Sequence, residues 1–141
     1  MRIMGIDYGD SRIGIAISDP FGWTAQGVET IKWSDDITKP IERIKELCSK
    51  NRVEKIIIGL PKNMDGSLGE RAEKTLQFAE KLAESVDIEI IKWDERLTTV
   101  AANRTMHELG LKTSKKKNVV DQIAAVYILQ GYLDSISNGG I

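Results

Sequence analysis

The sequence contains one cysteine, Cys48, and three prolines among its 141 residues. A single thiol cannot form an intrachain disulfide or a cysteine-rich zinc site, so we expect a reducing, cytoplasmic environment. No apolar run approaches the roughly 18 residues that cross a membrane, and the N-terminus lacks the apolar core of a signal peptide. These absences predict a soluble protein without membrane contact, and we expect Cys48 to lie on a buried helix face.

Neither sign of charge dominates the chain. The 20 basic and 21 acidic residues give a net charge of −1, so any binding of nucleic acid must use local basic patches. Hydrophobic residues make up 41% of the chain, as is usual for a globular protein, and no linker, repeat or low-complexity tract divides it. The length predicts one domain spanning residues 1–141.

The first twenty residues predict two strands joined by a tight turn. Ile3, Met4 and Ile6 form an apolar run that ends in Asp7, and a second apolar run follows over 13–17. Asp7 is therefore held at the end of the first strand. Further strands are predicted at 25–33, 53–59 and 88–93, and helices at about 36–50, from Ser67 onward, 98–109 and 118–136.

Several details of these helices follow from local signals. The spacing of Ser67 and Glu70 predicts a capping box, with Leu68 on the buried face of that helix. Gly110 is expected to end the third helix, and the basic stretch 112–118 is expected to be a loop. The last helix is predicted to bury a stripe of apolar residues, comprising Val120, Ile123, Ala124, Tyr127 and Ile128.

The order of elements predicts an α/β fold with a mixed sheet and helices on both faces. The first three strands form a meander, whereas the first, fourth and fifth are expected to be parallel. Ligands of open α/β sheets bind at the carboxyl ends of such strands. Asp7, Asp94, Glu95 and Asp121 are expected to converge there.

Carboxylates gathered in this way suit Mg²⁺ or Mn²⁺, and two such ions can activate a water and stabilise the leaving oxygen in phosphodiester cleavage. Each acid alone has a simpler explanation. Asp7 is also explained as a turn residue, Asp121 as an acid favoured near a helix N-terminus, and residues 94–96 as an exposed ion-pair cluster. Either Asp94 or Glu95 could face the site, and we favour Glu95 because its longer side chain reaches further inward.

Four ordered motifs resemble the YqgF/RuvX family, which is linked to Holliday-junction resolution and to maturation of the 16S ribosomal RNA 5′ end. They are GIDYG-x-x-RIGIA (5–16), GLP-x-x-MDGS-x-G (59–69), DERLTT (94–99) and VVD-x-x-AA-x-x-IL-x-x-YL (119–133). The resemblance covers essentially the whole chain. It implies an RNase H-like fold with strand order 3-2-1-4-5 and an antiparallel strand 2. It also implies a metal-dependent nuclease with Asp7, Glu95 and Asp121 as catalytic metal ligands and Mg²⁺ or Mn²⁺ as cofactor.

Polar and basic residues flank these motifs and are expected to contact the nucleic-acid backbone: Arg12, Lys62, Asn63, Arg71, Arg96, Lys115, Lys116 and Lys117. The expected partner is structured RNA or branched DNA, since one phosphodiester mechanism serves both. The protein is expected to be a monomer or a weak homodimer. Symmetric cleavage of a junction would favour a two-fold dimer. Two alternatives stay open: a non-catalytic ribosome-maturation factor and a nucleotide-binding phosphotransferase of the actin-like type.

Overall fold

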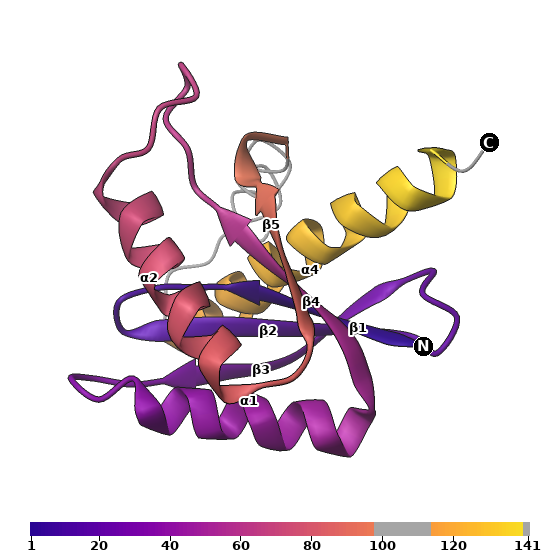
Figure 1. The fold of residues 1–141 in the computed structure, drawn as a ribbon, viewed down its shortest axis with the longest axis horizontal. Coiled ribbons are helices and arrows are strands. Elements are labelled where there is room, and N and C mark those ends of the chain that lie inside the picture. Colours follow the sequence, from indigo (N-terminus) through magenta and orange to yellow (C-terminus); the bar gives the residue numbers. More distant parts are fainter. Residues whose placement is uncertain (98–113, 140–141) are drawn as a thin grey trace.

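The computed structural model describes residues 1–97 and 114–139 (Figure 1). The strands are β1 (Arg2–Asp7), β2 (Arg12–Ser18), β3 (Ala25–Lys32), β4 (Val53–Leu60) and β5 (Glu89–Asp94). The helices are α1 (Thr38–Asn51), α2 (Glu70–Ser85) and α4 (Ser114–Gly139), and a short 3₁₀ turn, η1 (Glu95–Leu97), follows β5. The strands predicted at 25–33, 53–59 and 88–93 begin and end within one residue of their predicted limits.

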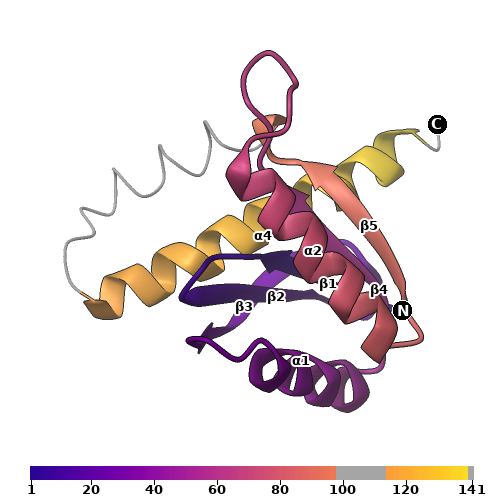
Figure 2. The same cartoon turned by 60° about the vertical axis from the view of Figure 1, so that its left-hand side comes forward.

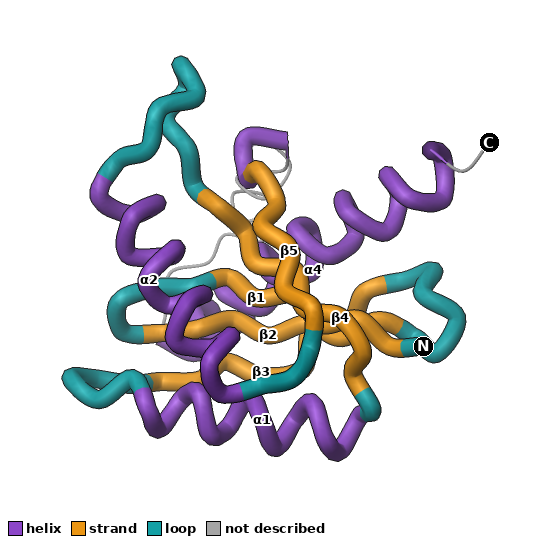
Figure 3. The backbone as a smooth tube through the Cα atoms, in the orientation of Figure 1, coloured by secondary structure: helices purple, strands orange, loops and turns teal. Residues whose placement is uncertain are grey.

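The five strands form one sheet in the order β3-β2-β1-β4-β5, which Figure 3 shows as a continuous twisted layer. β2 is antiparallel to β1 and β3, whereas β4 is parallel to both β1 and β5. The predicted order and the antiparallel strand 2 are thereby confirmed. Because β1, β4 and β5 are parallel, Asp7 and the start of η1 lie at the same edge of the sheet.

Helices cover both faces of this sheet (Figures 1 and 2). On one face, α1 and α2 pack against alternating strand residues such as Met4, Ile6 and Ile58, and this cluster includes Cys48. On the other face, α4 packs against Ile3 and Ile57. Burial of Cys48 confirms the role predicted for it and raises the pKa of its thiol to about 11.

Two predicted helix starts are wrong. Helix α2 begins at Glu70 with Gly69 as its N-cap and makes no side-chain capping bond. Instead, the Ser67 hydroxyl donates to Asp65 Oδ1 at 2.6 Å, so Ser67 closes a turn in the loop. Leu68 is consequently exposed rather than buried. Asp65 Oδ1 accepts from both the hydroxyl and the backbone N–H of Ser67, so these two groups are already bonded within the loop.

Helix α4 begins at Ser114, four residues before its predicted start, so residues 114–118 are helical and not a loop. Its buried stripe is also shifted along the helix. Of the predicted residues, Ile128 is fully buried, and the side chains packed into the core with it are Ala125, Leu129, Tyr132 and Leu133. Within the described ranges, no helix has the length and apolar character needed to cross a membrane.

Candidate active site

Three acidic residues reach one edge of the sheet from three different elements. Asp7 is the last residue of β1, Glu95 is the first residue of η1, and Asp121 is the eighth residue of α4. Strand alternation places Asp7 on the same face as Ile3 and Gly5, which is the face that α4 covers. The site therefore lies between the sheet and α4.

Asp121 is held close to Asp7 by a glycine. Gly14 pairs with Asp7 in the antiparallel β1–β2 ladder, so their Cα atoms are about 4.5–5.5 Å apart. A Cβ atom added at Gly14 would overlap the backbone carbonyl of Asp121. Only glycine permits α4 to approach β2 this closely, and the approach fixes the backbone of Asp121 beside Asp7.

Glu95 reaches toward the same point across β4. Its Cγ lies 2.9 Å from the position that a Cβ of Gly59 would occupy, so the side chain lies over the end of the neighbouring strand. Asp94 is engaged elsewhere, because its Oδ2 accepts a 2.7 Å bond from Arg96 Nη2, and this bond lowers the Asp94 pKa. The geometry thus supports the choice of Glu95 over Asp94 as the inward-facing acid.

The electrostatics of Asp7 show how close these acids are. Burial, followed by the negative charges of Glu95 and Asp121, raises the pKa of Asp7 to about 7, while Arg71 partly opposes this rise. The pKa of Glu95 is also raised, chiefly by burial. Like charges held together out of water produce this pattern when no cation balances them.

The donor set has the chemistry of a magnesium or manganese site, since these ions bind carboxylate oxygens. Among the side chains that the structure describes, however, no three acidic, histidine or cysteine groups lie close enough together to hold a metal ion as they stand. Asp121 has one oxygen engaged, because its Oδ2 accepts a 2.7 Å bond from Arg12 Nε. The raised pKa values of Asp7 and Glu95 nevertheless show a setting that a cation would stabilise.

Of the predicted phosphate contacts, Arg12, Arg71 and Lys62 lie near the acids. Arg12 pairs with Asp121, Arg71 lowers the pKa of both Asp7 and Glu95, and Lys62 lowers that of Asp94. These interactions place positive charge around the acidic edge without neutralising it.

The remaining predicted contacts have structural partners or lie further along α4. The Arg96 guanidinium bonds to Asp94 and donates to the Met64 carbonyl at 3.3 Å, which ties η1 to the β4–α2 loop. Asn63 Nδ2 donates to Ser67 Oγ within that loop. Residues Lys115, Lys116 and Lys117 belong to the first turns of α4.

The two tryptophans Trp33 and Trp23 have different surroundings. Trp33 packs against Tyr8 and donates from Nε1 to the Gly9 carbonyl at 3.0 Å, so it has a structural role. Trp23 is 71% exposed and stacks on Phe21. The predicted helix 98–109 and its expected end at Gly110 lie outside the described residues.

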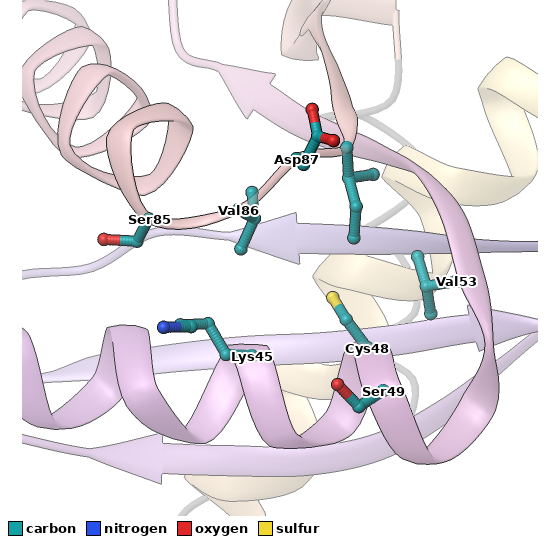
Figure 4. Close-up of a pocket in the computed structure, with 8 residues that line it drawn as sticks. Lys45, Cys48, Ser49, Val53, Ser85, Val86 and Asp87 are labelled. Carbon is teal, nitrogen blue, oxygen red and sulfur yellow. The ribbon is translucent and has the colours of Figure 1, made fainter.

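A cavity of about 320 Å³ lies at the other end of the sheet (Figure 4). It is lined by residues near the ends of α1 and α2, including Lys45, Cys48 and Asp87, and by Val53 at the start of β4. Because β4 and β5 begin here, the cavity is a full strand length from the acids. It therefore forms no part of the acidic site.

Sequence reasoning proposed these acids but did not identify the two glycines that they lie against. Gly14 admits the backbone of Asp121, and Gly59 admits the side chain of Glu95. A signal was available, because Gly5, Gly14 and Gly59 occupy strand positions that alternate with large apolar residues. Such alternation of glycine with isoleucine marks the sheet face to which a helix comes close.

A mixed sheet with this strand order, carrying three acids at one edge, defines an RNase H-like protein. In structure, the chain is similar to Thermus thermophilus RuvC solved with a Holliday junction substrate, with a TM-score of 0.62, 16% identity, and coverage of 99% of this chain and 97% of that one. It is likewise similar to a second Thermus thermophilus RuvC structure, with a TM-score of 0.58, 13% identity and the same coverage. At these identities the likeness concerns the fold.

Residues 1–135 match the family described as "RuvX: Holliday junction resolvase", and the chain belongs to that nuclease family. It is 68% identical over 136 residues to a protein of Acetivibrio thermocellus named "Putative pre-16S rRNA nuclease", covering 96% of each chain. It is also 58% identical over 137 residues to a protein of the same name from Ruminiclostridium cellulolyticum, covering 97% of this chain and 96% of the relative. The family resemblance drawn from the four motifs is thereby confirmed.

Proposed function

We propose that this protein is a metal-dependent endonuclease that hydrolyses phosphodiester bonds in structured nucleic acid, and that its substrate is the 5′ end of precursor 16S ribosomal RNA in the cytoplasm. The observation that carries the proposal is the convergence of Asp7 at the end of β1, Glu95 against Gly59 and Asp121 against Gly14, where burial and the charges of Glu95 and Asp121 raise the pKa of Asp7. A fold does not by itself retain buried like charges that destabilise it, so this arrangement points to chemistry.

In this proposal Asp7, Glu95 and Asp121 hold Mg²⁺ or Mn²⁺. When bound, such ions supply the positive charge that activates a water and stabilises the leaving oxygen. The carboxylates themselves select a hard divalent cation and fix it at the strand ends. Arg71 offsets part of the negative charge that would otherwise repel a phosphate, as its effect on both Asp7 and Glu95 indicates.

The basic residues around the edge position the nucleic-acid backbone. Arg12 and Lys62 flank the acids on opposite sides, next to Asp121 and Asp94 respectively. Asn63 and Arg96 extend this surface along the β4–α2 loop. Lys115, Lys116 and Lys117, in the first turns of α4, are proposed to add backbone contacts. Contacts of this kind bind phosphate without reading bases and weaken as salt increases.

The choice of ribosomal RNA is supported by the names of the two relatives above, whereas the family description favours a four-way DNA junction. The test compares a precursor 16S RNA fragment with a synthetic four-way junction, each titrated with Mg²⁺ and Mn²⁺. We expect faster metal-dependent cleavage of the RNA. Preferential cleavage of the junction would reassign the substrate, and binding without cleavage of either would support a non-catalytic maturation factor.

The same assay tests the site with an Asp7→Asn variant. Loss of one central carboxylate removes several kcal/mol of charge stabilisation, so cleavage should fall about a thousandfold while the fold persists. Asp10→Asn is the matched control, because Asp10 is exposed and pairs with Lys74 at 3.4 Å rather than with the acids. If Asp7→Asn cleaved as fast as the wild type, the assignment of Asp7 as a metal ligand would be refuted.

A further inference from the structure

A cavity of about 270 Å³ lies beyond the edge of the sheet at which the acids gather. It is formed by residues that follow β1, by residues that follow β3, and by one side of α2 (Figure 1). Both β1 and β3 are antiparallel to β2, so both end at this edge. We call this space the Tyr8 cavity. Its position suits a ligand, because open α/β sheets bind ligands beyond the carboxyl ends of their strands.

Aromatic side chains form one part of the wall and are held in place by packing. The ring of Tyr8 stacks on Phe78, with centroids 4.7 Å apart, and its centroid lies 6.1 Å from that of Trp33. Phe78 is buried in the core, and Trp33 Nε1 donates to the Gly9 carbonyl at 3.0 Å. Tyr8 and Trp33 themselves are half-buried. The cavity therefore has a preformed aromatic surface against which a planar ring can pack.

The polar part of the lining combines hydrogen-bond donors with acceptors. It consists of two carboxylates, one amide and two ammonium groups, from Asp10, Asp35, Gln77, Lys74 and Lys81. One carboxylate and one ammonium group already pair, since Lys74 Nζ lies 3.4 Å from Asp10 Oδ2. The formal charges of the lining cancel, so the cavity favours an uncharged polar ring over a phosphate or a metal ion.

A nucleobase matches both the size and the chemistry of the Tyr8 cavity. Pockets for whole small-molecule ligands measure about 300–1,000 Å³, so a cavity of about 270 Å³ suits a single ring system. Unpaired bases are recognised by stacking on aromatic side chains and by hydrogen bonds to their edges. Carboxylates accept from the amino group of cytosine, and amide side chains pair with adenine. The lining supplies both kinds of contact.

The Tyr8 cavity is joined to the acids through Arg71. A smaller cavity of about 80 Å³ shares Tyr8 and Lys74 with it and is also lined by Arg71. The charge of Arg71 in turn opposes the rise in the pKa of Asp7 and of Glu95. Tyr8 follows Asp7 directly, so their Cα atoms are about 3.8 Å apart. A base in the cavity and a phosphate at the acids can therefore belong to neighbouring positions of one strand.

We propose that the Tyr8 cavity binds one unpaired base of the strand whose phosphodiester lies at the acids. A base within a duplex is stacked and paired, so it has to leave the helix before it can enter. The protein therefore selects a cleavage point beside a single-stranded tail, a bulge or a branch over one within a continuous duplex. The inference rests on the proposed function, because it places the scissile phosphate at Asp7 and Glu95.

The test measures binding with a chelator present, so that metal-dependent cleavage does not take place. The probes are a blunt RNA hairpin, the same hairpin with a short single-stranded tail at either end, and tailed hairpins in which one base at a time is replaced by an abasic site. The wild type should bind a tailed hairpin more tightly than the blunt one. Removing the base that enters the cavity should weaken binding about tenfold, as loss of one base–aromatic contact typically does.

Tyr8→Leu removes the ring but keeps an apolar side chain against Phe78. In this variant the intact tail and the tail lacking the sensitive base should bind equally, and comparing two probes on one protein cancels any general loss of affinity. Tyr8→Phe keeps the ring and should retain the tenfold effect. Trp23→Leu is the matched control, because Trp23 is an aromatic residue that is 71% exposed but follows β2 at the opposite edge of the sheet. It should also retain the effect.

If Tyr8→Leu does not fold, Gln77→Ala replaces it. Gln77 is exposed on α2, so its truncation removes a contact to the base edge without disturbing the core, and it should reduce the effect of the sensitive base.

Four outcomes would overturn the role of the cavity in the wild type or its variant. They are equal binding of the blunt and tailed hairpins, binding of neither, an abasic series without a sensitive position, and a single-base effect that persists unchanged in the variant. These outcomes are distinct from failure of the proposed function, which is judged by cleavage. That function fails when Asp7→Asn cleaves as fast as the wild type, whatever the abasic series shows.

Discussion

The two faces of the sheet are formed by the same five strands but carry different side chains. The face under α1 and α2 is lined by large residues, including Ile6, Ile15 and Ile58, which are completely buried. The face under α4 has Gly5, Gly14, Ala16 and Gly59 at the alternating strand positions. One face is filled by large side chains, whereas the other lets a helix backbone approach the strands.

This difference separates stability from position. Burial of large side chains on the α1/α2 face removes the most apolar area from water and stabilises the fold. On the α4 face, missing side chains bring Asp121 close to Asp7, and that face also carries acids whose repulsion destabilises the folded state. Substitutions on the first face should therefore change stability alone, and substitutions on the second should change cleavage.

The largest change in stability is expected on the α1/α2 face. Ile44 of α1 is fully buried, so Ile44→Ala should lower the free energy of unfolding by about 2–5 kcal/mol through lost burial and a residual cavity. Urea denaturation measures this loss.

The same variant tests whether that face is independent of the site. At a temperature where Ile44→Ala stays folded, its cleavage rate per folded molecule should equal that of the wild type. A rate loss well beyond the unfolded fraction would show that the two faces are coupled, and would contradict the comparison.

The sheet could be predicted from the sequence because its signals are local and strong. The apolar runs around Ile6 and 55–59 and the alternation in 25–33 define strands whose order then follows from chain connectivity. Helix starts were less secure. Ser67 has the spacing of a cap, but a competing bond to Asp65 decides its role, and such competition depends on loop geometry.

At the site, the acids could be proposed from their places at strand ends and from family motifs. The contacts that these acids make and their effects on one another's pKa could not be predicted. Nothing local to Arg12 indicates that it pairs with Asp121, which lies 109 positions away in the chain. The pKa of Asp7 likewise depends on burial and on two distant charges. Contacts between remote segments arise only from packing, and periodicity within each segment does not encode them.

The next effect in size concerns the acids on the α4 face and depends on pH. The pKa of Asp7 rises from 3.8 to about 7 on folding, so between these values the folded protein holds a proton that the unfolded chain has released. Metal-free stability should therefore fall as pH rises from about 4 to 7, and level off above 7. Because asparagine does not ionise, Asp7→Asn should not lose unfolding free energy over this pH range. It should be more stable than the wild type at pH 8 by about 2–4 kcal/mol.

Urea denaturation with a chelator present, at pH 5 and pH 8, measures both proteins under metal-free conditions. The advantage of Asp7→Asn should be larger at pH 8 than at pH 5. Asp10→Asn serves again as the control, and its difference from the wild type should be small at both values. An Asp7→Asn protein less stable than the wild type at pH 8 would show that burial and the neighbouring charges do not destabilise the ionised Asp7 carboxylate.

The smallest effect on the free energy of unfolding is expected from a substitution at Gly14. The same substitution should nevertheless reduce the cleavage rate strongly. A methyl group there would overlap the Asp121 carbonyl, so Gly14→Ala must shift α4, at a typical cost of about 1–3 kcal/mol. A shift of about 1 Å in one group of a catalytic site can reduce a rate about 100-fold, so under the proposed function Gly14→Ala should lower the cleavage rate about 100-fold. Gly27→Ala is the matched control, because the nearest atoms to a Cβ there belong to the Gln122 side chain, at 3.0 Å and beyond, and not to backbone. If Gly14→Ala retained wild-type cleavage, close approach of α4 would not be what positions Asp121, and the distinction between the two faces would be lost.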